Sequence, residues 1–192
     1  MRGGHRHRRT ALEAPQGRCR VFVTGRHPGT VLLSSIDENL YALDGATGKE
    51  QWKFILGSVG SQSPTEAGGV VYIGGENGNL HALDIIDGSE KWHFFAGGVV
   101  ASSPTVADAV VYFGSYHSLF AVDAATGEQQ WKATTDGNVF TRPAVVDGVV
   151  YVGSEGGTLL AVDAVTGERR WKTAVGSVVS LSLTVSDGVI YA

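Results

Sequence analysis

Four aspartates at matching places in a repeated sequence are the first residues that could bind a metal ion or act in acid–base chemistry. They are Asp44, Asp84, Asp123 and Asp163, and each precedes a glycine by four residues and a tryptophan by eight. Carboxylates from one shared site could hold calcium. Equivalent positions of a repeat lie on different structural units, however, so the four carboxylates are not expected to meet on one ion. We expect each to accept a hydrogen bond from a backbone N–H two residues further on, in a turn that includes the glycine.

Two polar loops and a few isolated residues complete the candidates for metal chemistry. Residues 36–39 and 76–79 could offer oxygen ligands, although acidic residues in hairpin loops are usually solvated. His5 and His7 alone would make a poor metal site. Cys19 is the only cysteine, which excludes an internal disulfide and any multi-cysteine metal site. The sequence therefore assigns no catalytic, cofactor-binding or metal-binding residue.

Three residues that break the repeat consensus are the candidates for ligand contact. They are Tyr116, His117 and Phe140, within the loop segments 115–118 and 136–140. Loops that differ between repeats are where a repeat protein usually places its binding residues. Drift of ordinary surface residues explains the same three positions equally well, so both interpretations stay open.

The elements that must position these loops follow from the spacing of the tryptophans. Trp52, Trp92, Trp131 and Trp171 are the four tryptophans of the chain, and they stand 40, 39 and 40 residues apart. A period of this size indicates a repeat architecture. One tryptophan per repeat, on an outer strand, is expected to wedge against the next unit and to donate its Nε1–H to a carbonyl.

Each repeat contains four short strand signals. In the fourth repeat they cover residues 141–146, 149–153, 158–163 and 168–173, joined by short Gly-containing segments of hairpin length. Pro64, Pro104 and Pro143 are expected to open the first strand of their repeats. No repeat shows a helical period. The pattern predicts an all-β fold, a β-propeller of four-stranded blades with about four to five blades present.

The predicted domain boundaries divide the chain into an arm and a propeller. Residues 1–19 form a basic, disordered arm, and residues 20–192 form blades near 20–55, 60–95, 100–135 and 139–175 with a partial blade at 178–192. A short strand is expected within residues 20–25.

The charge of the chain is uneven, and this bears on its partners. Residues 1–20 carry six Arg and one Glu, a net charge of +5, whereas the rest carries nine Lys or Arg and eighteen Asp or Glu, a net charge of −9. An acidic body argues against nucleic acid as a partner. No apolar run is long enough to span a membrane, and no apolar segment of a signal peptide follows the N-terminal arginines.

The repeated motif, with Val-Val-Tyr-x-Gly followed by Leu-x-Ala-Val-Asp-Ala-x-Thr-Gly-Glu-x-x-Trp-Lys, resembles the PQQ-like repeat of the quinoprotein alcohol dehydrogenase-like β-propellers. The resemblance covers roughly residues 31–192 and recurs four times. The family includes quinone-dependent dehydrogenases that often use a vicinal cysteine pair and a calcium ion bound by Glu, Asn and Asp. It also includes cofactor-free propellers, such as outer-membrane assembly lipoproteins and extracellular sensor domains, and its members are usually exported.

The resemblance leads to two functional hypotheses. The first is a non-catalytic binding or scaffolding propeller, without cofactor, that presents loops to a protein or small-molecule ligand. The second is a fragment of a PQQ-dependent dehydrogenase, with PQQ and calcium as cofactors; one cysteine and no cysteine pair argue against it. Members of the family usually close with about eight blades, or roughly 320 residues at ~40 per blade. We therefore expect part of a longer propeller, a small ring closed by its own ends, or self-association that completes one ring.

Overall fold

The computed structural model describes residues 29–58, 62–176, 183–186 and 189–191, and all regular structure in these ranges is β-strand. The basic arm and the strand expected within residues 20–25 lie outside the described residues. The strands are β1 (Thr30–Ser34), β2 (Asn39–Asp44), β3 (Glu50–Ile55), β4 (Thr65–Ala67), β5 (Val70–Gly74), β6 (Asn79–Asp84), β7 (Glu90–Phe95), β8 (Thr105–Ala107), β9 (Val110–Ser115), β10 (Ser118–Asp123), β11 (Gln129–Thr134), β12 (Ala144–Val146), β13 (Val149–Ser154), β14 (Thr158–Asp163), β15 (Arg169–Ala174), β16 (Thr184–Ser186) and β17 (Val189–Tyr191).

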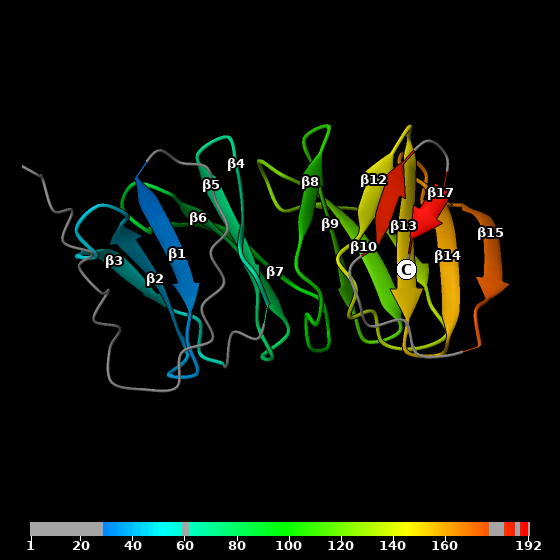
Figure 1. Cartoon of the computed structure of the whole chain (residues 1–192), viewed down its shortest axis with the longest axis horizontal. Coiled ribbons are helices and arrows are strands. Elements are labelled where there is room, and N and C mark those ends of the chain that lie inside the picture. The colour runs from blue at the N-terminus through cyan, green and yellow to red at the C-terminus, as the bar shows by residue number, and fades with distance from the viewer. Residues whose placement is uncertain (1–28, 59–61, 177–182, 187–188, 192) are drawn as a thin grey trace, which may run out of the picture.

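These strands form consecutive antiparallel sheets that follow one another along the chain. Three sheets have four strands, in the orders β4-β5-β6-β7, β8-β9-β10-β11 and β12-β13-β14-β15. The sheet β1-β2-β3 precedes them and the pair β16-β17 follows them. Figure 1 shows the sheets standing side by side, like blades, from the blue N-terminal strands to the orange β15. The predicted all-β architecture of a partial β-propeller is thus confirmed.

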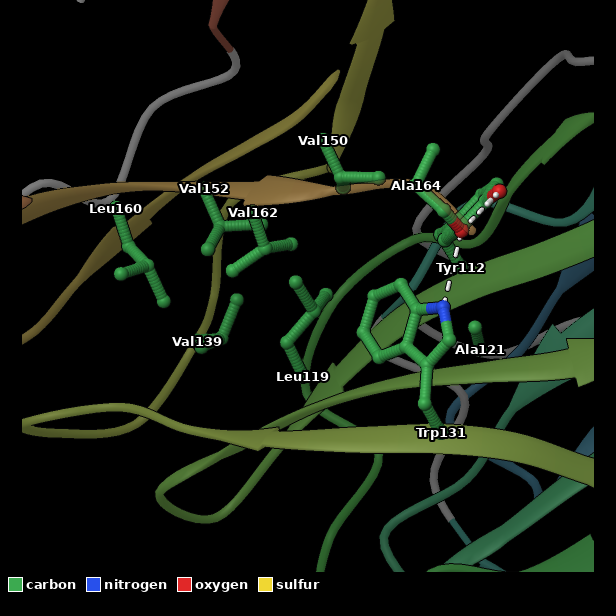
Figure 2. Close-up of a cluster of buried hydrophobic side chains, with 10 residues drawn as sticks. All are labelled: Tyr112, Leu119, Ala121, Trp131, Val139, Val150, Val152, Leu160, Val162 and Ala164. Atoms are coloured by element: carbon green, nitrogen blue, oxygen red, sulfur yellow. Dashed lines mark hydrogen bonds between the residues drawn. The ribbon is translucent and has the colours of Figure 1, made fainter. Parts of the chain in front are cut away.

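The hydrophobic core lies between neighbouring sheets rather than within one layer. In β10, Leu119 packs in a cluster with β13 and β14, whereas the adjacent Phe120 packs in a cluster with β5 and β9. Successive side chains of a strand point to opposite faces, so both faces of an interior blade are buried. Figure 2 shows the cluster between the third and fourth sheets, where Val150 and Val162 face Leu119. The consecutive apolar residues of the strands reflect this double burial.

Each interior tryptophan joins its blade to the next one, as predicted. Trp131 donates its Nε1–H to the carbonyl of Ala164 at 2.9 Å, and the hydroxyl of Tyr112 donates to the same oxygen at 3.2 Å (Figure 2). Trp52 and Trp92 make the corresponding bonds to the carbonyls of the following blade, at 2.9 and 3.1 Å.

The repeated aspartates close turns, also as predicted. The Oδ1 atom of Asp163 accepts the backbone N–H groups of Val165 and Thr166, each at 3.0 Å, and Gly167 has a left-handed φ of 71°. The same arrangement recurs at Asp44 and Asp123. The carboxylates therefore serve one turn each.

The innermost strands are shorter than the sequence suggested. In the fourth sheet the first strand was expected over residues 141–146, but β12 begins at Ala144, directly after Pro143. The hydroxyl of Thr141 replaces the missing ladder bonds, because it accepts the N–H of Gly153 at 3.0 Å and donates to its carbonyl at 3.1 Å. Proline cannot donate a ladder bond, so a side chain takes its place.

Candidate functional site

The candidate contact residues lie at one end of the blades. Within each sheet the second-to-third strand loop and the segment leaving the fourth strand lie at the same end, because the strands alternate in direction. Tyr116 and His117 form the loop between β9 and β10, and Phe140 lies between β11 and β12. The N–H of Thr135 donates to the carbonyl of His117 at 3.0 Å, which ties these two segments together. The structure thus brings the three predicted residues to one end of the molecule.

Tyr116 and Phe140 have exposed rings, and His117 has a backbone that few residues adopt. The exposed fractions are 51% for Tyr116 and 39% for Phe140. His117 has a φ of 49°, at the place where the neighbouring loops have Gly78 and Gly157 with positive φ. This loop is one residue shorter than its equivalents, which accounts for the single 39-residue step between tryptophans.

Further exposed apolar side chains gather at the same end, and sequence reasoning missed most of them. We call this set the apolar loop end. It comprises Ile36, Ile55, Phe95, Tyr116, Phe140 and Val175. Ile55 and Phe95 end outer strands, three residues after a tryptophan, where the later repeats have Thr134 and Ala174. This difference between the repeats was the sequence signal that could have indicated an apolar surface at the loop end.

Two of these rings rest directly on glycine backbone. A Cβ on Gly78 would lie 3.1 Å from the ring of Phe95, and a Cβ on Gly98 would lie 2.5 Å from the ring of Tyr116. The same Cβ position on Gly78 would lie 3.2 Å from the carbonyl oxygen of Gly98, so the two glycines are neighbours. The two aromatic rings therefore flank one glycine-lined stretch of surface.

Polar contacts hold the segment before Phe140 against the fourth sheet. The side-chain amide of Asn138 donates to Glu155 Oε2 at 2.8 Å, and Lys172 forms an ion pair with Asp136. Beside this ion pair is a cavity of about 30 Å³. Its lining residues are Thr134, Thr135, Asp136, Val152, Ser154, Thr158, Leu160, Arg169 and Lys172. That volume suits a water molecule rather than an organic ligand.

A cluster of titratable side chains lies apart from the loop end, between the first two sheets. His81 is buried, its Nδ1 lies 2.7 Å from Glu90 Oε1, and His93 Nδ1 lies 3.4 Å from the same oxygen. Burial lowers the pKa of His81, and the hydrogen bond with Glu90 offsets part of that shift. Phe54 packs edge-on against the imidazole, at 5.3 Å between ring centres. His81 thus occupies a core position.

The polar loops proposed as oxygen ligands use their side chains within the turns. Asp37 accepts the hydroxyl of Tyr41 at 2.7 Å and the N–H of Asn39 at 3.2 Å. Asn77 accepts the N–H of Asn79 at 3.1 Å and donates to the carbonyl of Leu56 at 2.7 Å. Within the described ranges, no three His, Cys, Asp or Glu side chains are placed to share a metal ion. The side chains of Asp37 and Asn77 are thus already hydrogen-bonded within the fold.

Comparisons with known proteins agree with the fold. The family model described as outer membrane protein assembly factor BamB matches residues 36–138 and 117–192. A search of curated protein sequences found no match. In the part of the chain that the structure describes, no helix is long and apolar enough to cross a membrane.

Three solved structures illustrate the likeness. BamB from Moraxella catarrhalis superposes with a TM-score of 0.77 at 24% identity, over 90% of this chain and 57% of BamB. The computationally designed Ika8 protein gives 0.75 at 18% identity, over 84% of this chain and 51% of the design. Quinohemoprotein alcohol dehydrogenase from Comamonas testosteroni gives 0.74 at 17% identity, over 84% of this chain and 37% of the enzyme.

This chain therefore spans little more than half the length of the BamB protein that it resembles. The family model covers most of the repeats, and the tryptophan and aspartate contacts described above recur with the same period. The chain belongs to the PQQ-like repeat β-propellers, in the family described as outer membrane protein assembly factor BamB.

Proposed function

We propose that this chain is a non-catalytic scaffold that binds a protein partner through the apolar loop end. The observation that carries the proposal is the gathering of exposed apolar side chains at one end of the blades, with Phe95 and Tyr116 beside each other on glycine backbone. Exposed apolar groups of this kind mark interaction surfaces. The description of the matching family, an assembly factor, is consistent with protein partners.

The chemistry of the site supports binding rather than catalysis. Tyr116 and Phe140 offer large rigid aromatic contacts, which are enriched at the centres of protein interfaces. His117 supplies a single imidazole, and no described acid or nucleophile shares a hydrogen bond with it. Nearby, the Nδ2 atom of Asn138 and the carboxylate of Asp136 make contacts that hold the loop in place.

Photo-crosslinking in cells that express the chain tests this proposal. Tyr116→p-benzoylphenylalanine keeps an aromatic side chain at the apolar loop end, and the same replacement at Val165, exposed on a turn at the opposite end, is the matched control. We expect a discrete protein adduct from position 116 only, and its loss when Phe95→Ser is added. Equal adducts from both ends, or none from position 116, would contradict the proposal.

The second hypothesis, a quinone-dependent dehydrogenase fragment, finds less support. The likeness to the Comamonas testosteroni enzyme, at 17% identity, is a likeness of fold. We propose that the chain binds neither PQQ nor calcium, because its four repeated aspartates lie on different blades and each serves a separate turn. Stoichiometric calcium in a dialysed sample, or a bound chromophore after addition of PQQ and calcium, would overturn this.

A further inference from the structure

Arg142 is a charged residue on the innermost part of the blades that the function proposed above does not use. It stands directly before Pro143 and β12, where the earlier repeats have Ser63 and Ser103. Its Nη2 donates to Thr65 Oγ1 at 3.0 Å, and its Nε donates to Thr105 Oγ1 at 3.3 Å. One side chain therefore joins three successive blades.

These contacts place the guanidinium on the axial side of the sheets. Thr65 lies on β4 and Thr105 on β8, and each of these strands is the innermost edge of its sheet. The strands β4, β8 and β12 lie side by side in that order. To reach Thr65 from β12, the side chain of Arg142 must pass along the inner face of β8. The guanidinium thus lies beside the edge strands β4 and β8, at the inner side of the described sheets.

The two partners of Arg142 are neutral hydroxyl groups, and each already donates its own hydrogen to a backbone carbonyl. The hydroxyl of Thr65 donates to the carbonyl of Pro104 at 2.7 Å, and that of Thr105 donates to the carbonyl of Pro143 at 2.6 Å. Both oxygens are therefore acceptors toward Arg142. Within the described ranges, Arg142 forms no ion pair with a carboxylate.

Toward the described residues, the guanidinium therefore keeps unused hydrogen-bonding capacity. It has five N–H donors in a planar fork, of which two meet these hydroxyls. Burial lowers the pKa of Arg142, which marks a partly desolvated charge. A cation in such a place is stabilised by an anion that completes its hydrogen bonds.

The other repeats show that the blades can be joined here without a charge. Ser103 Oγ accepts the N–H of Ser63 at 3.0 Å and so links the second and third blades. A serine at position 142 would provide the same small hydroxyl. Structural linkage alone therefore does not require arginine.

We propose that Arg142 anchors a site for a small oxyanion, a carboxylate or a phosphate group, beside the inner edge strands β4 and β8 at the loop end. The planar fork matches two oxygens of such a group, and the flanking hydroxyls of Thr65 and Thr105 hold the fork in place. The acidic body of the chain, with a net charge of −9 over residues 21–192, disfavours large polyanions, so the ligand is small.

Titration calorimetry at constant ionic strength tests the proposal. The probes are inorganic phosphate and succinate, with chloride as the reference anion, and the two probes separate a phosphate site from a carboxylate site. The native chain is expected to bind one of the probes saturably, and Arg142→Ser is expected to weaken that binding about tenfold or more, as for a lost charged hydrogen bond. Arg170→Ser, which removes an arginine paired with Asp163 at the surface, is the matched control and keeps the affinity.

A second measurement keeps the proposal testable if Arg142→Ser does not fold. The Nε–H signal of Arg142, assigned with Arg142→Lys, is expected to shift in the NMR spectrum of the native chain as the bound probe is added. Absence of saturable binding to the native chain, equal affinity in Arg142→Ser, or an Nε–H signal that stays unmoved would each overturn the proposal.

Discussion

The four tryptophans have the same sequence neighbours but different surroundings. Trp131 is 7% exposed and bonded to the next blade, whereas Trp171 is 40% exposed. No hydrogen bond corresponding to that of Trp131 extends from Trp171 within the described residues. Burial, rather than the residue type, should therefore decide what each ring contributes to stability.

We predict that Trp131→Ala lowers the free energy of unfolding by about 3–5 kcal/mol, the usual cost of truncating a buried aromatic side chain. Trp171→Ala should cost clearly less, because part of its ring already faces solvent. Urea titrations of both variants measure the difference. Similar, small losses of unfolding free energy at the two positions would contradict the packing of the Trp131 ring between neighbouring blades.

His81 should make stability depend on pH. The folded state holds its imidazole with a pKa below the ordinary value of 6.5, whereas the unfolded chain takes up the proton near 6.5. The unfolded state thus binds more protons in this range, so stability is fully present above pH 6.5 and is lost as the pH falls toward the folded-state pKa.

We predict that His81→Phe flattens this part of the stability profile, because Phe120 occupies the equivalent place in the next blade. Urea midpoints from pH 7.5 to 5 provide the measurement. Phe120→Leu, which alters core packing at the equivalent position without removing a titratable group, is the control and should keep the native slope. A native profile already flat between pH 6.5 and 5 would contradict the prediction.

At the scale of the element, the turn after each third strand is fitted to the tryptophan of the preceding blade. Gly127 has a φ of 75°, and a Cβ there would lie 2.6 Å from the ring of Trp92. Gly148 has a similar φ of 70° but nothing within 4 Å of such an atom. Substitutions at Gly148 therefore report the cost of backbone strain alone, whereas those at Gly127 add the cost of a clash with the neighbouring blade.

We predict that Gly148→Ala costs only the left-handed strain of about 1–2 kcal/mol. Gly127→Ala should cost measurably more, because the added methyl must also displace the indole. Chemical denaturation of the two variants gives the comparison. Equal losses would mean that the ring shifts freely and that the turn is not a close contact.

The repeats made most of these elements predictable, and the exceptions have physical causes. The third strand of the fourth repeat was predicted as residues 158–163 and is β14 over Thr158–Asp163. The first strand was predicted too long, because Thr141 uses its side chain where a strand would use its backbone. Phe95 was missed at the loop end because its exposure depends on the neighbouring loop. Arg142 was missed because its partners lie 37 and 77 residues away.

At the scale of the whole molecule, the last four-stranded sheet along the chain, β12-β13-β14-β15, has an exposed fourth strand, β15. All six residues of β15 are exposed, whereas β11 buries its tryptophan. In repeat arrays, stability is a sum of unit and neighbour-interface terms. Among the described residues, the face of this sheet that bears Trp171 therefore lacks part of one such term and presents an indole ring to solvent.

We predict that the 192-residue chain, prepared alone, self-associates or aggregates rather than remaining an open monomer. Size-exclusion chromatography with light scattering measures the mass. Self-association should weaken in Trp171→Lys, which places a charge on the exposed face. A monodisperse monomer whose small-angle scattering fits an open arc would contradict the expectation.

The exposure of Trp171 also gives the protein a built-in optical probe. An indole in contact with water emits at longer wavelength and is quenched by iodide, whereas the indoles of Trp52 and Trp131 are shielded by the next blade. The fluorescence of the native chain should therefore contain a red-shifted, quenchable component that disappears in Trp171→Phe. Any partner chain, ligand or second copy that covers this face would shift that component to the blue, so coverage of the open blade can be followed without a label.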